Sequence, residues 1–196
     1  GQLYYSVNQG NVDFNIQKLL PHKFSEYGPS LAAGDVNGDG FDDIVAGGNS
    51  LFATTLLLQQ PNGSFLQKKI TQPTEIRDFH YQDMGTILFD ADEDGDLDLY
   101  LARGGYESKP NTVAYRDQFF INDGKGNFTT DTLALPQNFA SKSCVRAADY
   151  DKDGDLDLFV GGRIVPGEYP LPPRSYILNN NNGIFTDVTA VVCPSL

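Results

Sequence analysis

The chain has 196 residues, 40% of them hydrophobic, and a formal net charge of −12 from 26 Asp and Glu against 14 Lys and Arg. This acidity argues against nucleic acid as a partner, because phosphate backbones are bound by basic patches. No apolar run reaches about 18 residues, so the sequence predicts no membrane span.

Three acidic strings follow one another along the chain, at Asp35–Asp43, Asp90–Asp98 and Asp149–Asp157. Each has oxygen-bearing side chains at positions 1, 3, 5 and 9 and a glycine at position 6. Calcium takes six to eight oxygen ligands, and the glycine permits the sharp turn that gathers them. The strings therefore predict three metal-binding loops.

The flanks of the strings repeat as well. The first residues of the strings lie 55 and 59 residues apart, a period typical of stacked supersecondary units. Each string leads into an apolar run that ends in two glycines. A turn signal ahead of a Phe follows, at Asn62-Gly63, Asp123-Gly124 and Asn182-Gly183. Each unit therefore reads as strand, loop, strand, linker, strand, turn and strand.

In the third unit we expect strands over residues 144–148, 156–160, 175–178 and 184–188, from their alternation and β-branched or aromatic content. Four short antiparallel strands per repeat make up a propeller blade. The alternative of an EF-hand-like loop fails at position 12, where a bidentate Glu is required. Ala46, Leu101 and Val160 stand there instead.

On these motifs the chain resembles the FG-GAP/VCBS repeat family, whose calcium loops lie in β-propellers such as those of integrin α-subunits and many secreted bacterial proteins. The resemblance covers residues 4–192. It implies three Ca²⁺ ions, each held by the side chains at positions 1, 3, 5 and 9 and the carbonyl at position 7. The implied ligands are Asp35, Asn37, Asp39, Phe41 (carbonyl), Asp43, Asp90, Asp92, Asp94, Asp96 (carbonyl), Asp98, Asp149, Asp151, Asp153, Asp155 (carbonyl) and Asp157.

The chain departs from the family pattern in two ways. The aromatic-Gly pair before the first strand survives only as Tyr27-Gly28, and the Gly-Ala-Pro signature is Gly-Gly in all three units. These departures make the chain more similar to the bacterial branch than to integrins.

We expect an all-β fold, a β-propeller segment of about three and a half four-stranded antiparallel blades. A trailing half-blade would occupy residues 1–21, and three blades would occupy residues 22–75, 76–138 and 139–196. Both ends interrupt this pattern, so we interpret the chain as a piece of a longer protein. Because open blade edges tend to pair, self-association is a further expectation.

Calcium loops of extracellular modules bind with dissociation constants up to about 10⁻³ M, so such sites fill outside the cytosol. The chain is therefore expected in an extracellular, periplasmic or cell-surface location. Its two cysteines, Cys144 and Cys193, cannot make a disulfide scaffold and are expected to be free. Asn62 and Asn127 begin glycosylation sequons, but their place at turn signals favours a role in the turns.

The leading functional hypothesis is a non-catalytic binding or scaffold module for a glycan or a protein. The linkers at residues 105–115 and 162–174 carry Tyr, Pro and a basic residue, and we expect them to form the binding rim. One alternative is a carbohydrate-active enzyme, such as a polysaccharide lyase or glycosidase. The two histidines, His22 and His80, lie in no catalytic motif, which counts against it. The other alternative is a cell-adhesion propeller.

Overall fold

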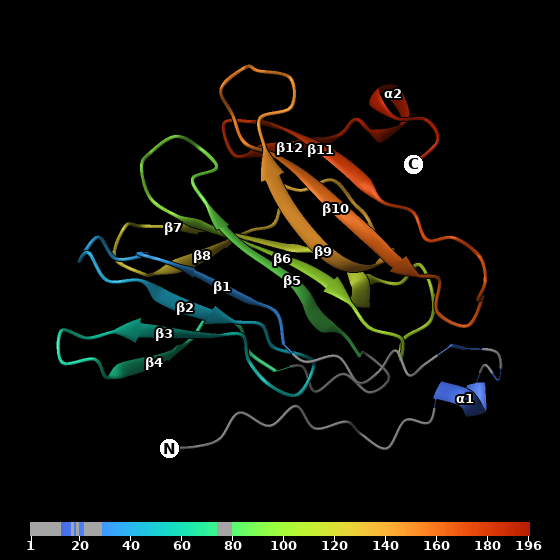
Figure 1. The fold of residues 1–196 in the computed structure, drawn as a ribbon, viewed down its shortest axis with the longest axis horizontal. Helices are drawn as coiled ribbons and strands as arrows, with labels where there is room; N and C mark the ends of the chain where they lie inside the picture. Colours follow the sequence, from blue (N-terminus) through green and yellow to red (C-terminus); the bar gives the residue numbers. More distant parts are fainter. Residues whose placement is uncertain (1–12, 17, 19, 22–28, 74–79) are drawn as a thin grey trace.

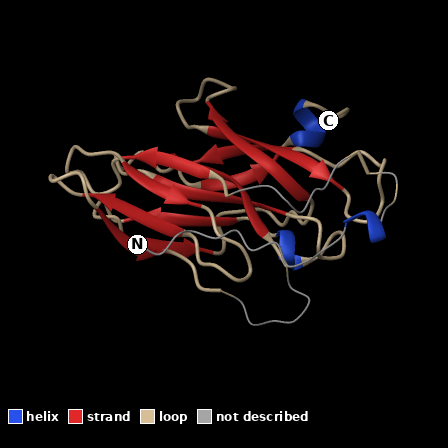
Figure 2. Cartoon of the chain, turned by 60° about the horizontal axis from the view of Figure 1, so that its bottom comes forward, coloured by secondary structure: helices blue, strands red, loops and turns tan. Residues whose placement is uncertain are grey.

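The computed structural model describes residues 13–16, 18, 20, 21, 29–73 and 80–196. Strands make up most of the regular structure, and the helices are short (Figure 2). The elements are α1 (Asp13–Ile16), β1 (Leu31–Gly34), β2 (Asp43–Ala46), β3 (Thr55–Gln59), β4 (Phe65–Lys69), β5 (Gln82–Phe89), β6 (Asp98–Gly104), η1 (Val113–Tyr115), β7 (Gln118–Asn122), β8 (Phe128–Asp131), β9 (Ser141–Ala148), β10 (Asp157–Ile164), β11 (Tyr176–Asn181), β12 (Ile184–Asp187) and α2 (Thr189–Val192).

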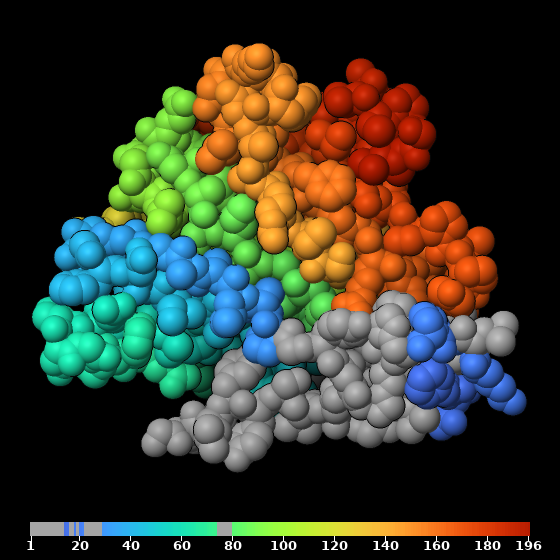
Figure 3. Space-filling model, viewed as in Figure 1, coloured from blue at the N-terminus to red at the C-terminus, as the bar shows by residue number. Residues whose placement is uncertain are grey.

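The strands form three separate antiparallel sheets of four, each in chain order: β1–β4, β5–β8 and β9–β12 (Figure 1). We refer to them as blade 1, blade 2 and blade 3. They lie side by side as successive bands of the molecule (Figure 3). The expected all-β, propeller-like segment is therefore confirmed for the three blades. The half-blade expected over residues 1–21 falls largely outside the described residues, and α1 is the described element within it.

Turn chemistry closes the outer hairpin of each blade. In blade 3, Asn182 and Gly183 have φ of 50° and 84° and join β11 directly to β12, as a tight hairpin requires. In blade 1 the carbonyl Oδ1 of Asn62 accepts the amide of Ser64 at 2.9 Å. The turn interpretation of these Asn-Gly pairs is thus confirmed.

The core lies between the blades. Between blades 1 and 2, a cluster of aliphatic and aromatic side chains is buried: Val36, Val45, Leu56, Leu99, Leu101 and Phe120. Between blades 2 and 3, the cluster includes Phe89, Phe119 and Phe185, whose ring centroids lie 5.4–6.4 Å apart. Along β6, Leu99 and Leu101 face blade 1 and Tyr100 and Ala102 face blade 3, which is how a sheet buried on both faces packs.

Three of the four strands of blade 3 (β9, β10 and β11) are longer than the sequence predicts. β9 begins at Ser141 rather than near Cys144, and β10 continues through Gly161 and Gly162 to Ile164. The pairing accommodates the glycines through register shifts, so they act as bulges inside the strand rather than as its end. In blade 2, Gly104 allows a close approach, because an added Cβ would lie 2.1 Å from the carbonyl oxygen of Lys142 in blade 3.

Candidate metal centre

The three acidic loops occupy equivalent places, each between the first and second strand of its blade. In Figure 1 they lie on the same side of the molecule. The second and third loops are neighbours, since a Cβ added at Gly154 would lie 3.7 Å from Oε1 of Glu93. The repeat in sequence therefore becomes a row of three loops in space.

Two backbone positions in every loop have a left-handed conformation. Position 6 is the predicted glycine, with φ of 86° at Gly40, 92° at Gly95 and 109° at Gly154. Position 4 is also left-handed, at Gly38, Glu93 and Lys152, with φ between 60° and 73°. Position 4 has no common signal in the sequence, because only the first loop has a glycine there.

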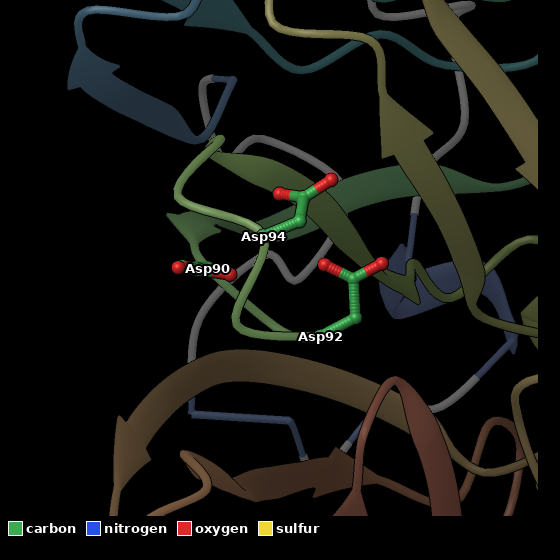
Figure 4. Close-up of side chains that lie close together, drawn as sticks. All are labelled: Asp90, Asp92 and Asp94. Carbon is green, nitrogen blue, oxygen red and sulfur yellow. The ribbon is translucent and has the colours of Figure 1, made fainter.

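The second loop gathers the carboxylates of positions 1, 3 and 5. Asp90, Asp92 and Asp94 each offer an oxygen within 4.8 Å of the others (Figure 4). Oδ1 of Asp90 and Oδ1 of Asp92 are buried and have no hydrogen-bond partner. Buried carboxylate oxygens without a donor are costly, and a cation would satisfy them. Burial first, and then the charge of Asp94, raise the pKa of Asp92.

The third loop brings together the same three positions, Asp149, Asp151 and Asp153, again within 4.8 Å. All three residues are exposed, whereas Asp90 and Asp92 of the second loop are half-buried. Nδ2 of Asn179 on β11 donates to Oδ2 of Asp151 at 2.8 Å and so ties this loop to its own blade.

The first loop has an amide among its carboxylates. Asn37 at position 3 donates from Nδ2 to Oδ2 of Asp39 at 3.1 Å. Asp35 accepts four backbone amides, from residues 37–40, at 2.8–3.3 Å. The carboxylate oxygens of this loop are therefore partly satisfied by hydrogen bonds from donors of the loop itself.

Position 7 is the predicted carbonyl ligand, at Phe41, Asp96 and Asp155. In each loop its amide donates to Oδ1 of the position 5 Asp, at 2.9, 2.9 and 3.1 Å. This repeated bond turns the backbone at the end of the loop. The role of the position 7 carbonyls as ligands stays a prediction.

Position 9 has a role that the sequence did not predict. Asp43, Asp98 and Asp157 are buried, and each accepts the amide of position 2 at 3.2–3.3 Å and a third-strand amide at 2.8–2.9 Å. Burial raises the pKa of Asp98 to about 6, against the opposing effect of these amides. Among the described residues, the gathered carboxylate groups include positions 1, 3 and 5 but not position 9. Its role as a metal ligand stays a prediction.

The loops also contact the following blade. Nδ2 of Asn122, at the end of β7, donates at 2.8 Å to the carbonyl of Val36 in the first loop. Asn180 of blade 3 donates in the same way, at 2.8 Å, to the carbonyl of Ala91 in the second loop. No sequence signal singled out these asparagines, because the contact depends on how successive blades pack.

The two linkers expected to form a binding rim differ. Tyr106 and Tyr115 of the first linker are buried, and the Tyr115 hydroxyl donates to the carbonyl of Ser108 at 2.8 Å. Both rings pack inward, so the tyrosines of the first linker offer no aromatic surface to a ligand, and its part in a binding rim stays a prediction. The second linker keeps Tyr169 and Leu171 exposed.

Two further properties follow from the described residues. No helix among them is long and apolar enough to cross a membrane. Cys144 and Cys193 are free cysteines, as expected.

The comparisons with known proteins agree with the geometry. The family model of the FG-GAP-like repeat matches twice, at residues 35–101 and 90–160. Both matches begin at the first Asp of an acidic loop, so the family repeat is in register with the loops described above. No curated protein matches the chain significantly. The two matches together span more than half of the chain, which therefore belongs to the FG-GAP-like repeat family.

Proposed function

We propose that the chain is a calcium-binding module of an exported protein, and that it binds a glycan or protein ligand without catalysing a reaction. FG-GAP-like repeats are propeller-type modules that are typically non-catalytic and occur in exported proteins, which supports the proposal. The acidic clusters, which could hold a metal ion, support the calcium part.

The second loop carries this proposal. Three carboxylates within 4.8 Å repel one another, and each like-charged pair at about 4 Å costs about 1 kcal/mol even in water. Two of their buried oxygens lack any donor. Hard divalent cations with oxygen ligands fit this arrangement, and calcium fits it best because six to eight oxygens can be supplied by one loop and water.

Asp90, Asp92 and Asp94 would hold one ion, and Asp149, Asp151 and Asp153 a second. Asp35, Asn37 and Asp39 would hold a third in the first loop. Calcium, when bound, neutralises the gathered carboxylates. The loops then hold the first strand of each blade against its second strand, so the role of the sites is structural.

Export follows from the same chemistry. Sites of this kind with weak affinity fill at the millimolar calcium of extracellular space and remain empty at cytosolic levels. We therefore propose an extracellular, periplasmic or cell-surface location.

The second linker supplies the proposed ligand surface. Tyr169 and Leu171 are exposed on it, and Arg174 lies with its guanidinium carbon 4.8 Å from the centroid of the Tyr176 ring. Aromatic and Arg side chains are enriched at protein interfaces. This surface, rather than the first linker, is where a glycan or protein ligand would bind.

Calorimetric calcium titration of two matched variants tests the proposal. Asp92→Asn removes a gathered carboxylate, whereas Glu93→Gln makes the same change of charge at the next residue, outside the gathered group. We expect Asp92→Asn to abolish or weaken one binding event at least tenfold and Glu93→Gln to leave it within about twofold. Equal effects of the two variants would contradict a specific site and indicate general attraction by negative charge.

A further inference from the structure

The blades pack on one another in the same way at both junctions, between blades 1 and 2 and between blades 2 and 3. Residues of β6 show it most clearly, because Leu99 faces blade 1 and Tyr100 faces blade 3. In blade 3, Leu158 takes the place of Leu99 and packs against blade 2. Each blade thus has a trailing face that packs on the preceding blade and a leading face that receives the next one.

On the leading face of blade 3, the residue that corresponds to the buried Tyr100 of blade 2 is exposed. Phe159 stands in the register position of Tyr100, opposite Ile177 as Tyr100 stands opposite Phe119. Tyr100 is 0% exposed, whereas Phe159 is 40% exposed. Among residues 29–73 and 80–196, no strand packs on this face.

The trailing face of blade 1 is the other half of such a junction. Ile44 and Leu57 pair in β2 and β3 as Leu99 and Phe120 pair in blade 2. Phe65 stands in the register position of Phe185. Phe185 is 4% exposed between blades 2 and 3, whereas Phe65 is 45% exposed.

The two junctions share a hydrogen bond from a side-chain amide to a loop carbonyl. The two free faces carry the matching donor and acceptor. Asn122 and Asn180 donate to the position 2 carbonyl of the preceding loop. Gln59 has their place in blade 1, since its amide donates to Asp43 at 2.8 Å as theirs donate to Asp98 and Asp157. Within the described part of the chain its side-chain amide makes no hydrogen bond. Tyr150 has the corresponding carbonyl in the third loop.

We propose that the trailing face of blade 1 in one copy of the chain docks on the leading face of blade 3 in a second copy. Phe65 then packs on Ile177, which stands in the position of Phe119, because Phe185 packs on Phe119 between blades 2 and 3. Phe159 is covered in the same contact, as Tyr100 is, and the Gln59 amide reaches the Tyr150 carbonyl. The two different faces make the contact heterologous, and two such contacts close a ring. Two copies bring six described blades together, within the range of four to eight that propellers use.

This surface differs from the open strand edges that the sequence suggested. An edge contact would add strands to β4, β8 or β12 through backbone hydrogen bonds. The proposed contact instead buries side chains of sheet faces, so it depends on Phe65 and Phe159 and leaves the edges unpaired.

Sedimentation equilibrium of the 196-residue chain over a micromolar concentration series, in calcium-containing buffer, tests the proposal. We expect a species of twice the chain mass of 21.5 kDa. Phe65→Asp and Phe159→Asp should each weaken association at least a hundredfold, because each puts a charge into both junctions. Leu133→Asp is the matched control, since Leu133 is exposed outside both faces, and it should associate as the unmodified chain does.

Mixing the variants makes the test specific. An equimolar mixture of Phe65→Asp and Phe159→Asp chains contains one pair of undamaged faces, so a species of double mass should return. Gln59→Leu should weaken association about 25-fold, because it removes one hydrogen bond, worth about fivefold, from each of the two junctions. A monomer at every concentration, or a mixture that fails to recover association while both variants keep native circular dichroism, would overturn the proposal.

Discussion

Asn122 joins two blades at an acidic loop, because its Nδ2 donates to the Val36 carbonyl at 2.8 Å while its own amide donates to Asp98 at 2.9 Å. One residue therefore connects the loop of blade 1 to the loop of blade 2. Asn180 repeats the arrangement between Ala91 and Asp157. The loops and the blade junctions thus form a single hydrogen-bonded system, and calcium in one loop is expected to support the adjoining junction.

Truncating this asparagine tests the coupling. Asn122→Ala is expected to lower the free energy of unfolding by about 1–3 kcal/mol, because it leaves the buried carbonyl of Val36 without its donor. Urea unfolding of the calcium-loaded chain measures it. Gln137→Ala, at an exposed amide, is the control and should change the free energy by less than about 0.5 kcal/mol. Equal effects of both substitutions would show that the Asn122 bond adds nothing to the junction.

Breaking the buried ion pair of Lys142 and Asp117, between blades 2 and 3, is expected to lower the free energy of unfolding further than Asn122→Ala does. Nζ of Lys142 lies 2.9 Å from Oδ1 of Asp117, and both side chains are almost fully buried. Burial lowers the pKa of Lys142, and the charge of Asp117 opposes that change. Lys142→Met is expected to cost about 3–5 kcal/mol, because it leaves a buried carboxylate without its cation.

The matched double variant separates charge from packing. Asp117→Asn combined with Lys142→Met removes both charges, so its unfolding free energy in urea should exceed that of Lys142→Met alone. A double variant less stable than Lys142→Met would mean that Asp117 acts mainly through its bonds from the Tyr100 hydroxyl, at 2.6 Å, and the Arg103 amide, at 2.7 Å.

The first loop is expected to bind calcium most weakly. It has Asn37 where the others have Asp92 and Asp151, and ligand charge helps to set affinity. Asn37→Asp should therefore tighten the weakest binding event, by about fivefold or more, in a competition titration with a calcium indicator. Asn62→Asp adds the same charge at a distant turn and should leave it unchanged. Tighter binding by the unmodified first loop than by the other two would contradict this ranking.

The repeat architecture could be predicted from the sequence because its signals are local. Positions 1, 3, 5, 6 and 9 of each loop, the turns such as Asn182-Gly183, and the alternation of the strands all lie within a few residues of one another. The three blades and the gathering of Asp90, Asp92 and Asp94 agree with that prediction.

The missed features depend on packing between distant residues. Lys142 and Asp83 look like surface residues in the sequence, yet they are buried where successive blades meet. Tyr115 turns inward because Ser108 offers a partner for its hydroxyl. The glycine pair in β10 signals a strand end locally, whereas pairing with β9 carries the strand past it.

The most direct test of the proposed account is calcium titration of the chelator-stripped, unmodified chain by calorimetry, with thermal unfolding at both end points. We predict about three ions per chain, one for each loop, and a melting temperature several degrees higher with calcium. Absence of binding at millimolar calcium, with an unchanged melting temperature, would contradict the claim that these loops are metal sites.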